Sequence, residues 1–500
     1  MQYLVSGTKM KEIDKITILE IGIPSMVLME RAALFVSKEV EDKTSSSDRI
    51  LCLCGIGNNG ADGIAAARIL STKGRKVDVC VLGDSRKATE EWKSQFEVIK
   101  KMNIPVINII DNFTVVDKTF LRSYNFIIDA IYGIGINRPL EGVYKSTIDV
   151  INESGIYVIA VDIPSGINAD TGKVMGTGIV ADQTITFGYK KIGITLYPGA
   201  LYAGEIKVCD IGFLKQTLNK VGAEAFTYEE SDLAKIPRRD PYGNKGTFGK
   251  VLVIAGSKNM SGAAYFAGKA AYKMGAGLVG ILSSEVNRAI LQTKLPEAIL
   301  TTYEGNELLE EHTKAIEWAD VIIIGPGLGK SNMAKELVTY VLKDTNVPLV
   351  IDADGLNIIS ENTKLKESLS NRCIITPHLG EMTRLAGLTI DEIRLDIVDC
   401  ARTYASQNNI VCVLKDARTI VASQERQMYI NTNGNSGMAT GGSGDVLTGI
   451  IAGLLAMGLE CFTAASLGVF IHGLAGDKAK EVKGEYGMMA SDILDGLELK

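Results

Sequence analysis

Apolar and polar positions along the first third of the chain alternate in blocks typical of strands and helices. Short apolar runs predict strands, and longer stretches with apolar residues on one face predict amphipathic helices. We expect helices at 9–19, 25–42, 62–73, 88–102 and 143–154, and strands at 50–54, 77–82, 105–109, 126–130 and 156–161. Short β-rich runs between helices favour a parallel sheet with helices on both faces, a Rossmann-like three-layer α/β sandwich.

The pattern changes past Asp170 and then starts again. Strands at 183–187 and 205–210 are expected to extend the edge of the first sheet, and the more polar segment from Gln216 to Asp240 is the candidate junction. From Lys250 a second α/β pattern predicts strands at 250–255, 278–282, 321–325, 348–352, 373–376, 410–415 and 418–422, with helices at 261–275, 331–343 and two more after 444. The sequence therefore predicts two α/β domains, residues 1–215 and 225–500.

Composition supports several domains and excludes some classes of protein. Five hundred residues exceed what one hydrophobic core usually organises. The net charge of −6 and the absence of a Lys/Arg block argue against nucleic acid as a partner. The longest weakly polar run, 446–459, is too short to cross a membrane. Charged residues near the N-terminus fall where a secretory signal peptide would have its apolar core, so we expect a cytoplasmic protein.

Glycine and cysteine usage adds two expectations. The chain has 52 glycines but only 11 prolines, which indicates tight turns and close backbone approach to ligands rather than a flexible linker. Eight cysteines are few, and Cys52, Cys54, Cys80, Cys373 and Cys412 fall in apolar runs, so reduced core thiols are expected. Cys52 and Cys54 lack a second pair at zinc spacing.

A glycine-rich segment follows the predicted strand at 50–54. Its sequence, Gly55-Ile56-Gly57-Asn58-Asn59-Gly60-Ala61-Asp62-Gly63, leads into a helix, where free backbone N–H groups and the helix dipole suit a phosphate. The spacing is that of a dinucleotide-binding fingerprint, which also expects an acidic residue at the end of the second strand. Here the acidic residue, Asp78, lies inside that strand instead. The alternative interpretation is a tight turn without a ligand.

Two more strands of this half end in polar clusters. Asp129 ends one strand, and Asp162 ends the next and is followed by Ile-Pro-Ser165-Gly. Ligands bind at the carboxyl ends of parallel strands, so Asn59, Asp129, Asp162 and Ser165 are expected to converge. Each acid alone would also serve as a helix cap.

The motifs GxGNNGxDG, DxxxGxG and VDIPSG, in this order after GIPSMVLMERAA, resemble the NAD(P)H-hydrate epimerase domain across residues 1–215. The resemblance implies potassium at Asn59, Asp129 and Ser165, and proton transfer by Asp162, which also contacts substrate. The other substrate contacts that it implies are Asn58, Asn59, Gly60, Ala61, Asp62, Gly133, Ile134, Gly135, Ile136, Asn137, Arg138, Pro139 and Tyr144.

The second half carries its own glycine loop. Four glycines of 437–444 precede Asp445 and an apolar helix, an arrangement that makes an anion cradle of N–H groups with a carboxylate beside it. A plain loop with a helix cap is the alternative. Among the histidines, His378 at a strand end is a ligand-facing candidate, His472 is expected in the core, and His312 in an acidic surface stretch.

KGTFGxVLVIAGS, GPGLG, TPHxGEMxRL, LKDART and GMATGGSGDVL together resemble the ribokinase-like, ADP-dependent NAD(P)H-hydrate dehydratase domain across residues 225–500. The resemblance implies Asp445 as the catalytic base at the substrate hydroxyl, with ADP as co-substrate and Mg²⁺. The implied substrate contacts are Ala263, Gly327, His378, Leu379, Gly380, Glu381, Met382, Thr383, Arg384 and Asp445. The implied ADP contacts are Lys415, Asp416, Ala417, Arg418, Thr419, Asn435, Ser436, Gly437, Met438, Ala439, Thr440, Gly441, Gly442, Ser443 and Gly444.

The sequence thus favours a bifunctional repair enzyme that epimerises C6-hydrated NADH and NADPH and dehydrates the S form with ADP. Small-residue helices also suggest a homo-oligomer. The alternative is a ribokinase-like small-molecule kinase fused to a non-catalytic nucleotide-binding domain, which explains Asp445 but not the asparagine loop. A first half that only binds or scaffolds is disfavoured by its intact Asn59, Asp129, Asp162 and Ser165, and a dehydrogenase by the missing ribose acid.

Overall fold

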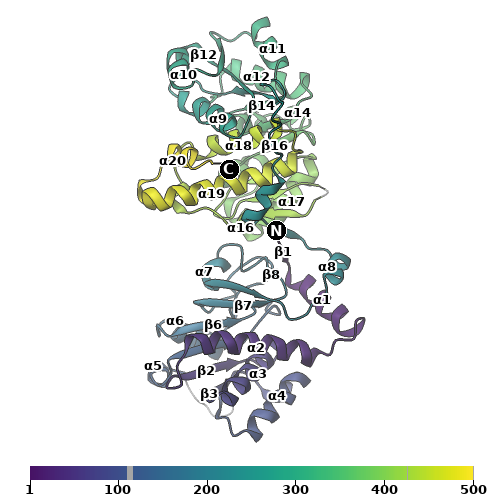
Figure 1. Cartoon of the computed structure of the whole chain (residues 1–500), viewed down its shortest axis with the longest axis vertical. Helices are drawn as coiled ribbons and strands as arrows, with labels where there is room; N and C mark the ends of the chain where they lie inside the picture. The colour runs from purple at the N-terminus through teal and green to yellow at the C-terminus, as the bar shows by residue number, and fades with distance from the viewer. Residues whose placement is uncertain (110–115, 425, 499–500) are drawn as a thin grey trace. The chain divides into compact units, whose positions relative to one another are not determined.

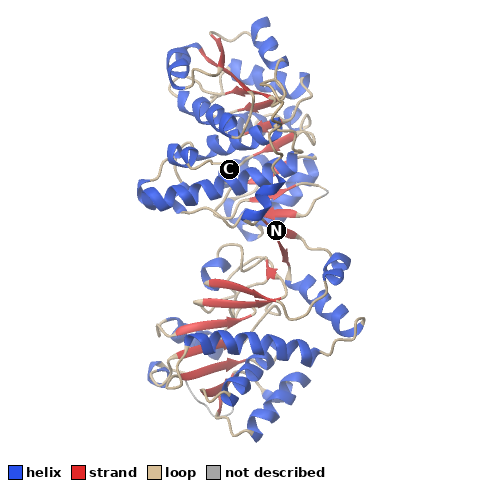
Figure 2. Ribbon diagram, in the orientation of Figure 1, coloured by secondary structure: helices blue, strands red, loops and turns tan. Residues whose placement is uncertain are grey.

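The computed structural model describes residues 1–109, 116–424 and 426–498. The chain folds into two compact units, Tyr3–Ala225 and Phe226–Lys500, with Met1–Gln2 grouped with the second. Both consist of strands that alternate with helices (Figure 1, Figure 2). The α/β fold class expected from the sequence is confirmed. No helix of the described chain has the length and apolar character needed to span a bilayer.

The N-terminal unit has a parallel seven-stranded sheet in the order β4-β3-β2-β5-β6-β7-β9. Its strands are β1 (Gln2–Val5), β2 (Arg49–Cys54), β3 (Lys76–Val81), β4 (Val106–Asn108), β5 (Phe126–Ala130), β6 (Tyr157–Val161), β7 (Gln183–Phe187), β8 (Lys190–Lys191) and β9 (Glu205–Cys209). Its helices are α1 (Gly7–Leu19), α2 (Ser25–Lys43), α3 (Asn58–Thr72), α4 (Glu90–Lys101), α5 (Lys118–Leu121), α6 (Gly142–Asn152), α7 (Gly199–Ala203) and α8 (Lys215–Val221). As expected, β7 and β9 extend one edge of the sheet.

Helices cover both faces of this sheet. One apolar cluster joins α2, α3 and α4 to one set of strand side chains, and a second joins α5 and α6 to the opposite set. Successive strand residues point to opposite faces, so Cys52 belongs to the first cluster while Leu51 and Leu53 belong to the second. The result is the three-layer sandwich that the pattern of apolar runs predicts.

The C-terminal unit has a mostly parallel sheet in the order β13-β12-β11-β14-β15-β16-β17-β18-β19-β10, with β18 antiparallel to β17 and to β19. The strands are β10 (Ala225–Thr227), β11 (Lys250–Ile254), β12 (Leu278–Ser284), β13 (Ile299–Tyr303), β14 (Val321–Ile324), β15 (Leu349–Ile351), β16 (Cys373–Ile375), β17 (Val411–Leu414), β18 (Ile420–Ala422) and β19 (Met428–Ile430).

Helices α9, α18 and α19 pack against the strands of this second sheet, and α18 also packs against both α9 and α19. The helices are α9 (Ser261–Lys273), α10 (Arg288–Lys294), α11 (Glu310–Glu317), α12 (Asn332–Asp344), α13 (Asp354–Ser360), α14 (Thr363–Lys366), α15 (Leu379–Ala386), α16 (Ile390–Leu395), α17 (Ile397–Asn408), α18 (Ser443–Ala456), α19 (Cys461–Gly487) and α20 (Ala490–Asp495). A Cβ on Gly449 of α18 would overlap the carbonyl of Ala267 in α9. These small residues therefore serve packing within the unit, and the homo-oligomer stays a prediction.

Two details differ from the sequence-based expectations. Helix α3 begins at Asn58 rather than near 62, because the chain turns already at Gly57, so the two asparagines form the first helical turn. His312 is buried rather than on the surface, with 1% of its area exposed. Its Nδ1 accepts a hydrogen bond from Leu309 N and its ring packs edge-on against Tyr303. The five cysteines expected in strands lie in strands, buried and unpaired.

Candidate active sites

The strand-to-helix turn of the N-terminal unit is built by glycines. A Cβ on Gly60 would overlap the carbonyl oxygen of Gly55, and one on Gly55 would overlap the carbonyl oxygen of Ile131. Strand β2 and the first turn of α3 therefore approach backbone to backbone. The N–H groups of this first turn have no partner within the helix, which suits them to an anion.

A cavity of about 660 Å³ opens beside this turn. Ile56, Gly57, Asn58 and Asn59 from the turn form one part of its wall. The segment that follows β5 contributes residues 131–135 and Arg138, and the lining also includes the charged side chains Asp14, Asp62, Asp162 and Lys191. Its size is that of a small-molecule site.

Asp162 stands directly after β6, with 8% of its area exposed. Its φ of 66° lies in the left-handed region, which Asp tolerates better than most residues but still at a cost. The backbone is fixed there because Asp162 N donates to Ile185 O at 2.8 Å. Asp162 Oδ1 accepts from Thr186 Oγ1 at 3.1 Å, from Phe187 N at 3.2 Å and from Lys191 Nζ.

Lys191 lies in β8 with only 1% of its area exposed. Besides Asp162, its ammonium donates to Thr186 Oγ1 and Phe187 O, both at 3.0 Å. All three donors are thus occupied, which is what a buried cation requires. Lys191 balances the charge of Asp162 and fixes where its carboxylate lies.

Asp129 and Ser165 hydrogen-bond to each other, and both are fully buried and outside the cavity lining. Asp129 lies opposite Leu53 of β2 and Ala160 of β6 in the parallel register, so the three strands end at one edge. Ser165 donates to Asp129 from its N at 2.8 Å and from its Oγ at 2.6 Å. Burial raises the pKa of Asp129 to about 6, and these hydrogen bonds oppose the rise.

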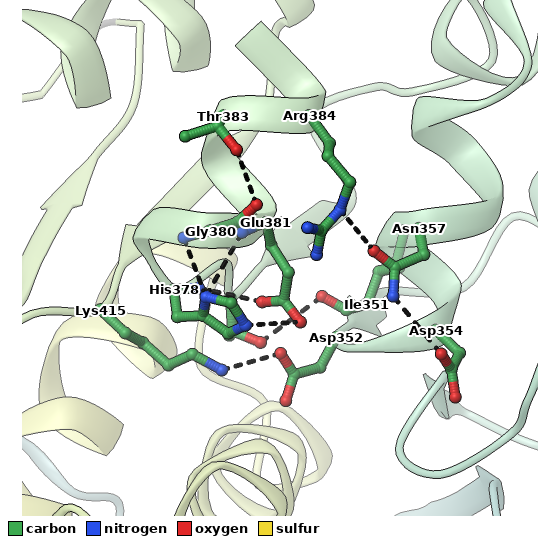
Figure 3. Close-up of polar contacts among 11 residues, drawn as sticks. Ile351, Asp352, Asp354, Asn357, His378, Gly380, Glu381, Thr383, Arg384 and Lys415 are labelled. Atoms are coloured by element: carbon green, nitrogen blue, oxygen red, sulfur yellow. Dashed lines mark hydrogen bonds and ion pairs between the residues drawn. The ribbon is translucent and has the colours of Figure 1, made fainter. Parts of the chain in front are cut away.

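The second site lies at the carboxyl ends of β14, β15, β16 and β17. Their registers align Ile324, Ile351, Ile375 and Cys412, so the following residues gather at one edge of the sheet. Asp352 follows β15 and Lys415 follows β17, and Lys415 Nζ lies 2.8 Å from Asp352 Oδ1 (Figure 3). Asp352 is buried.

Asp445 is the third residue of α18 and lies next to this ion pair. The helix is preceded by Gly442, whose φ of 93° is one that glycine adopts without strain. A Cβ on Gly444 would lie 3.2 Å from Lys415 Nζ and 3.4 Å from Asp352 Oδ2. Burial, and then the charge of Asp352, raise the pKa of Asp445 to about 7, while Lys415 opposes the rise.

His378 caps the start of α15. Its Nδ1 accepts from Gly380 N at 2.9 Å and from Glu381 N at 3.3 Å, and Glu381 Oε2 accepts from His378 N at 2.9 Å (Figure 3). Glu381 is buried, and this burial raises its pKa, with the charge of Asp352 adding to the rise and Lys415 opposing it. The His378 side chain is roughly half exposed, and its Nε2 lies 3.4 Å from Glu381 Oε1.

Two neighbouring networks hold the loops of this site. Arg384 Nε donates to Asn357 Oδ1 at 2.9 Å, and Asp354 Oδ2 accepts from Gly329 N at 2.8 Å (Figure 3 shows the first contact). In the other, Asn435 Nδ2 donates at 3.0 Å to Gly476 O and to Asp477 Oδ1. The glycine loop is thus anchored to α19.

Comparisons with known proteins match the whole chain. The family model described as NAD(P)H-hydrate dehydratase matches residues 251–498, and the one described as YjeF-related protein N-terminus matches residues 25–193. A bifunctional NAD(P)H-hydrate repair enzyme of Moorella thermoacetica is 38% identical, over 99% of this chain and 96% of that protein. One of Coxiella burnetii is 34% identical, over 100% of this chain and 99% of that protein.

The chain belongs to the bifunctional NAD(P)H-hydrate repair enzymes. Among solved structures, an ADP/ATP-dependent NAD(P)H-hydrate dehydratase from Bacillus subtilis, co-crystallised with ATP/Mg²⁺, is 30% identical with a TM-score of 0.45. The match spans 54% of this chain and 94% of the Bacillus subtilis chain. A ribokinase-like superfamily protein from Enterococcus faecalis is 29% identical with a TM-score of 0.49, over 55% of this chain and 94% of that chain.

In the N-terminal unit, the structure places many but not all of the expected site residues on the cavity wall. Those that line it are Asn58, Asn59, Asp62, Gly133, Ile134, Gly135, Arg138 and Asp162. Those outside the lining are Gly60, Ala61, Ile136, Asn137, Pro139 and Tyr144. Tyr144 packs on the cavity-lining Tyr132 with ring centroids 5.4 Å apart, so it supports the wall from behind.

In the C-terminal unit, His378 and Lys415 follow neighbouring strands of the sheet, and the other expected residues have differing contacts. Gly327 lies against Ala263, since a Cβ on the glycine would be 3.1 Å from the Ala263 Cβ. Asn435 is turned into the protein, and Ser443 Oγ lies 3.3 Å from His472 Nε2. His472 is thus a partnered histidine, as expected, and burial lowers its pKa to about 4.

Sequence reasoning misses three charged residues: Asp14, Lys191 and Asp352. Lys191 is the second of two adjacent lysines, and the apolar residues that follow it are the one sign in the sequence of its burial. The apolar run at 348–352 predicts Asp352 as the last residue of a strand, whereas β15 ends at Ile351 and leaves the carboxylate at the site. Asp14 lies on α1, a helix that carries no motif.

Proposed function

We propose that the N-terminal unit interconverts the R and S forms of C6-hydrated NADH and NADPH, and that the C-terminal unit dehydrates the S form. The second reaction consumes ADP and yields AMP and phosphate. The observation that carries the proposal is one aspartate at each of two strand-end sites: the buried Asp162 beside Lys191, and the partly buried Asp445 beside the Asp352–Lys415 pair. The family of the chain agrees with both activities.

Epimerisation needs reversible loss of the hydroxyl from C6, the carbon beside the ring nitrogen. The nitrogen lone pair forms a C=N bond as water leaves, and water then adds to the opposite face of the ring. Asp162 is proposed to accept a proton from the water that adds. Its Oδ1 accepts from Lys191, Thr186 and Phe187, and Asp162 lines the cavity. The phosphates of the substrate would lie at the start of α3.

We further propose that Asn59, Asp129 and Ser165 hold the potassium ion implied by the sequence. The donor set is all oxygen, as a hard cation prefers. Asn59 Nδ2 is buried with no partner among the described residues, and a rotation of the amide would present its oxygen at that place instead. Bound there, the ion would offset the charge of Asp129 and fix the segment after β5.

Dehydration needs a better leaving group than hydroxide. We propose that Asp445 takes the proton of the C6 hydroxyl, whose oxygen then attacks the terminal phosphoryl group of ADP. AMP departs, phosphate leaves from C6, and loss of a proton from C5 restores the dihydronicotinamide ring. A pKa of about 7 suits a base that works near neutral pH. The N–H groups of the glycine loop would stabilise the phosphoryl oxygens.

The Mg²⁺ proposed with ADP would be held mainly by the phosphates. Mg²⁺ sites commonly combine one or two carboxylates with substrate phosphates. The described residues contain no cluster of three or more His, Cys, Asp or Glu that would supply a full set of protein ligands. Asp352 and Asp445 lie close enough together to supply two carboxylates. When bound, the ion would neutralise charge on the phosphoryl group.

The test is to incubate the full chain with both C6 epimers of hydrated NADH and follow the near-ultraviolet absorbance of the dihydronicotinamide. Recovery of both epimers with ADP supports two activities. Recovery of one epimer only would contradict the epimerase assignment. Consumption of ATP with a phosphorylated product and no dihydronicotinamide would instead favour a ribokinase-like small-molecule kinase.

A further inference from the structure

Two carboxyl groups of the N-terminal cavity are left without partners. Asp62, on the first turns of α3, and Asp14, on α1, both line the cavity beside Asp162 and Lys191. Asp162 is bound by three donors, whereas neither Asp62 nor Asp14 has a hydrogen bond or ion pair within the described residues. The cavity thus holds one paired and two unpaired carboxyl groups.

Burial, and then the nearby carboxyl groups, favour the protonated form of Asp62. Burial raises the pKa of Asp62 well above its usual value, Asp162 and Asp14 add to the rise, and Lys191 opposes it. Burial also raises the pKa of Asp14 to about 6, with Lys191 opposing and Asp162 adding to the rise. The other titratable side chains on the cavity wall are Lys11, Lys87, Tyr132 and Arg138.

We propose that Asp62 is the general acid of the epimerase, which protonates the C6 hydroxyl, and that Asp14 is a positioning residue that keeps the proton on Asp62. This inference rests on the proposed epimerase activity of the N-terminal unit. One carboxyl group of the cavity would donate a proton and another would accept one, and their different surroundings set these opposite roles.

The proposed step balances without a further reactant. The Asp62 O–H bond breaks and its proton joins the C6 hydroxyl, the C6–O bond breaks, and the nitrogen lone pair forms the C=N bond as water departs. Water then adds to the other face, and its proton passes to Asp162. Transfer of that proton to Asp62 restores both groups. Lys191 cannot replace Asp62 as donor, since its three N–H bonds are already used.

The experiment measures exchange between the two epimers of hydrated NADPH by the full chain without ADP, so that dehydration does not interfere. Rates above the spontaneous exchange are recorded across pH for the wild type, Asp62→Asn, Asp62→Glu, Asp14→Asn and the control Asp42→Asn. Asp42 is an exposed residue of α2 that does not line the cavity, so its variant matches the charge change alone.

We expect Asp62→Asn to lower the exchange rate by about 10²- to 10⁴-fold, and Asp62→Glu to restore part of it. Because the acid must be protonated, the wild-type rate should fall as pH rises through the Asp62 pKa. Removing the charge of Asp14 lowers that pKa, so Asp14→Asn should move this alkaline limb to lower pH. Asp42→Asn should move neither rate nor limb.

Two results would overturn the inference: full exchange activity in Asp62→Asn, or an alkaline limb that stays in place in Asp14→Asn. The second measurement holds even if Asp62→Asn fails to fold, a failure that would show as loss of the thermal transition of the N-terminal unit. A wild-type chain that shows no exchange at all would refute the proposed epimerase itself, so the two failures are distinguishable.

Discussion

Replacing Asp445 by Asn tests the base of the dehydratase through both activity and stability. The folded-state pKa of Asp445 is about 7, against an ordinary value of 3.8. The difference between these two pKa values corresponds to at most roughly 4 kcal/mol. Because the folded protein prefers the neutral carboxyl, ionisation costs stability: stability falls as pH rises from 3.8 to 7, and the full cost is present above pH 7.

Asn has the shape of Asp445 without its charge, so the variant should be more stable than the wild type above pH 7. The thermal transition of the C-terminal unit should rise by up to roughly 10 °C, and the gain should vanish as pH falls toward 4. Dehydration should fall by about 10²- to 10⁴-fold while epimer exchange continues. Calorimetry across pH gives the first result, and the return of dihydronicotinamide absorbance with ADP gives the second.

The matched control is Asp344→Asn, an exposed aspartate at the end of α12. It should change neither the transition nor dehydration. A stability gain in Asp445→Asn that does not depend on pH would contradict the raised pKa, and wild-type dehydration in that variant would refute the role of Asp445 as base.

Three further results are expected. The base must be ionised, so the rate of dehydration at saturating ADP should rise with pH through about 7. Asp352→Asn should move this rise to lower pH, and Lys415→Met should move it to higher pH. A rise at the same pH in both variants would exclude Asp445 as the titrating group. Asp162→Ala should stop epimer exchange above the spontaneous rate while S-form dehydration persists; unchanged exchange would refute its role. Gly60→Ala should destabilise the N-terminal unit by more than about 2 kcal/mol, since its Cβ would overlap Gly55 O; an unaltered melting curve would show that the turn relaxes.

Much of each site follows from the order of strands in the sequence. Apolar runs predict the strands, and parallel strands end at one edge, so the sequence alone brings Asp129, Asp162 and Ser165 together. The start of α3 differs from the prediction because asparagines are typical of loops and caps, yet here the turn is completed by Gly57. The prediction for His312 is wrong because its neighbours Glu310 and Glu311 are charged, although the histidine lies on the inner face of α11.

The missed residues depend on contacts between segments that are distant in the chain. Asp14 and Lys191 reach the same cavity because β1 pairs with β8, with Leu4 opposite Lys190 and Val5 opposite Lys191. Nothing in a strand of two residues predicts this pairing. In the other unit, Lys415 meets Asp352 because β15, β16 and β17 are neighbours, whereas the sequence gives only their order along the chain.

The close approach of Gly55 and Gly60 has a consequence for inferring from related sequences how this activity is gained and lost. These glycines are required by the close approach of a strand and a helix, whether or not a nucleotide binds. A duplicated copy of the protein that no longer needs to be catalytic would keep these glycines for as long as it folds. The carboxyl groups of its cavity could be substituted. Gly55 and Gly60 therefore indicate common ancestry, whereas Asp62 and Asp162 are the positions that would distinguish a catalytically active copy from an inactive one.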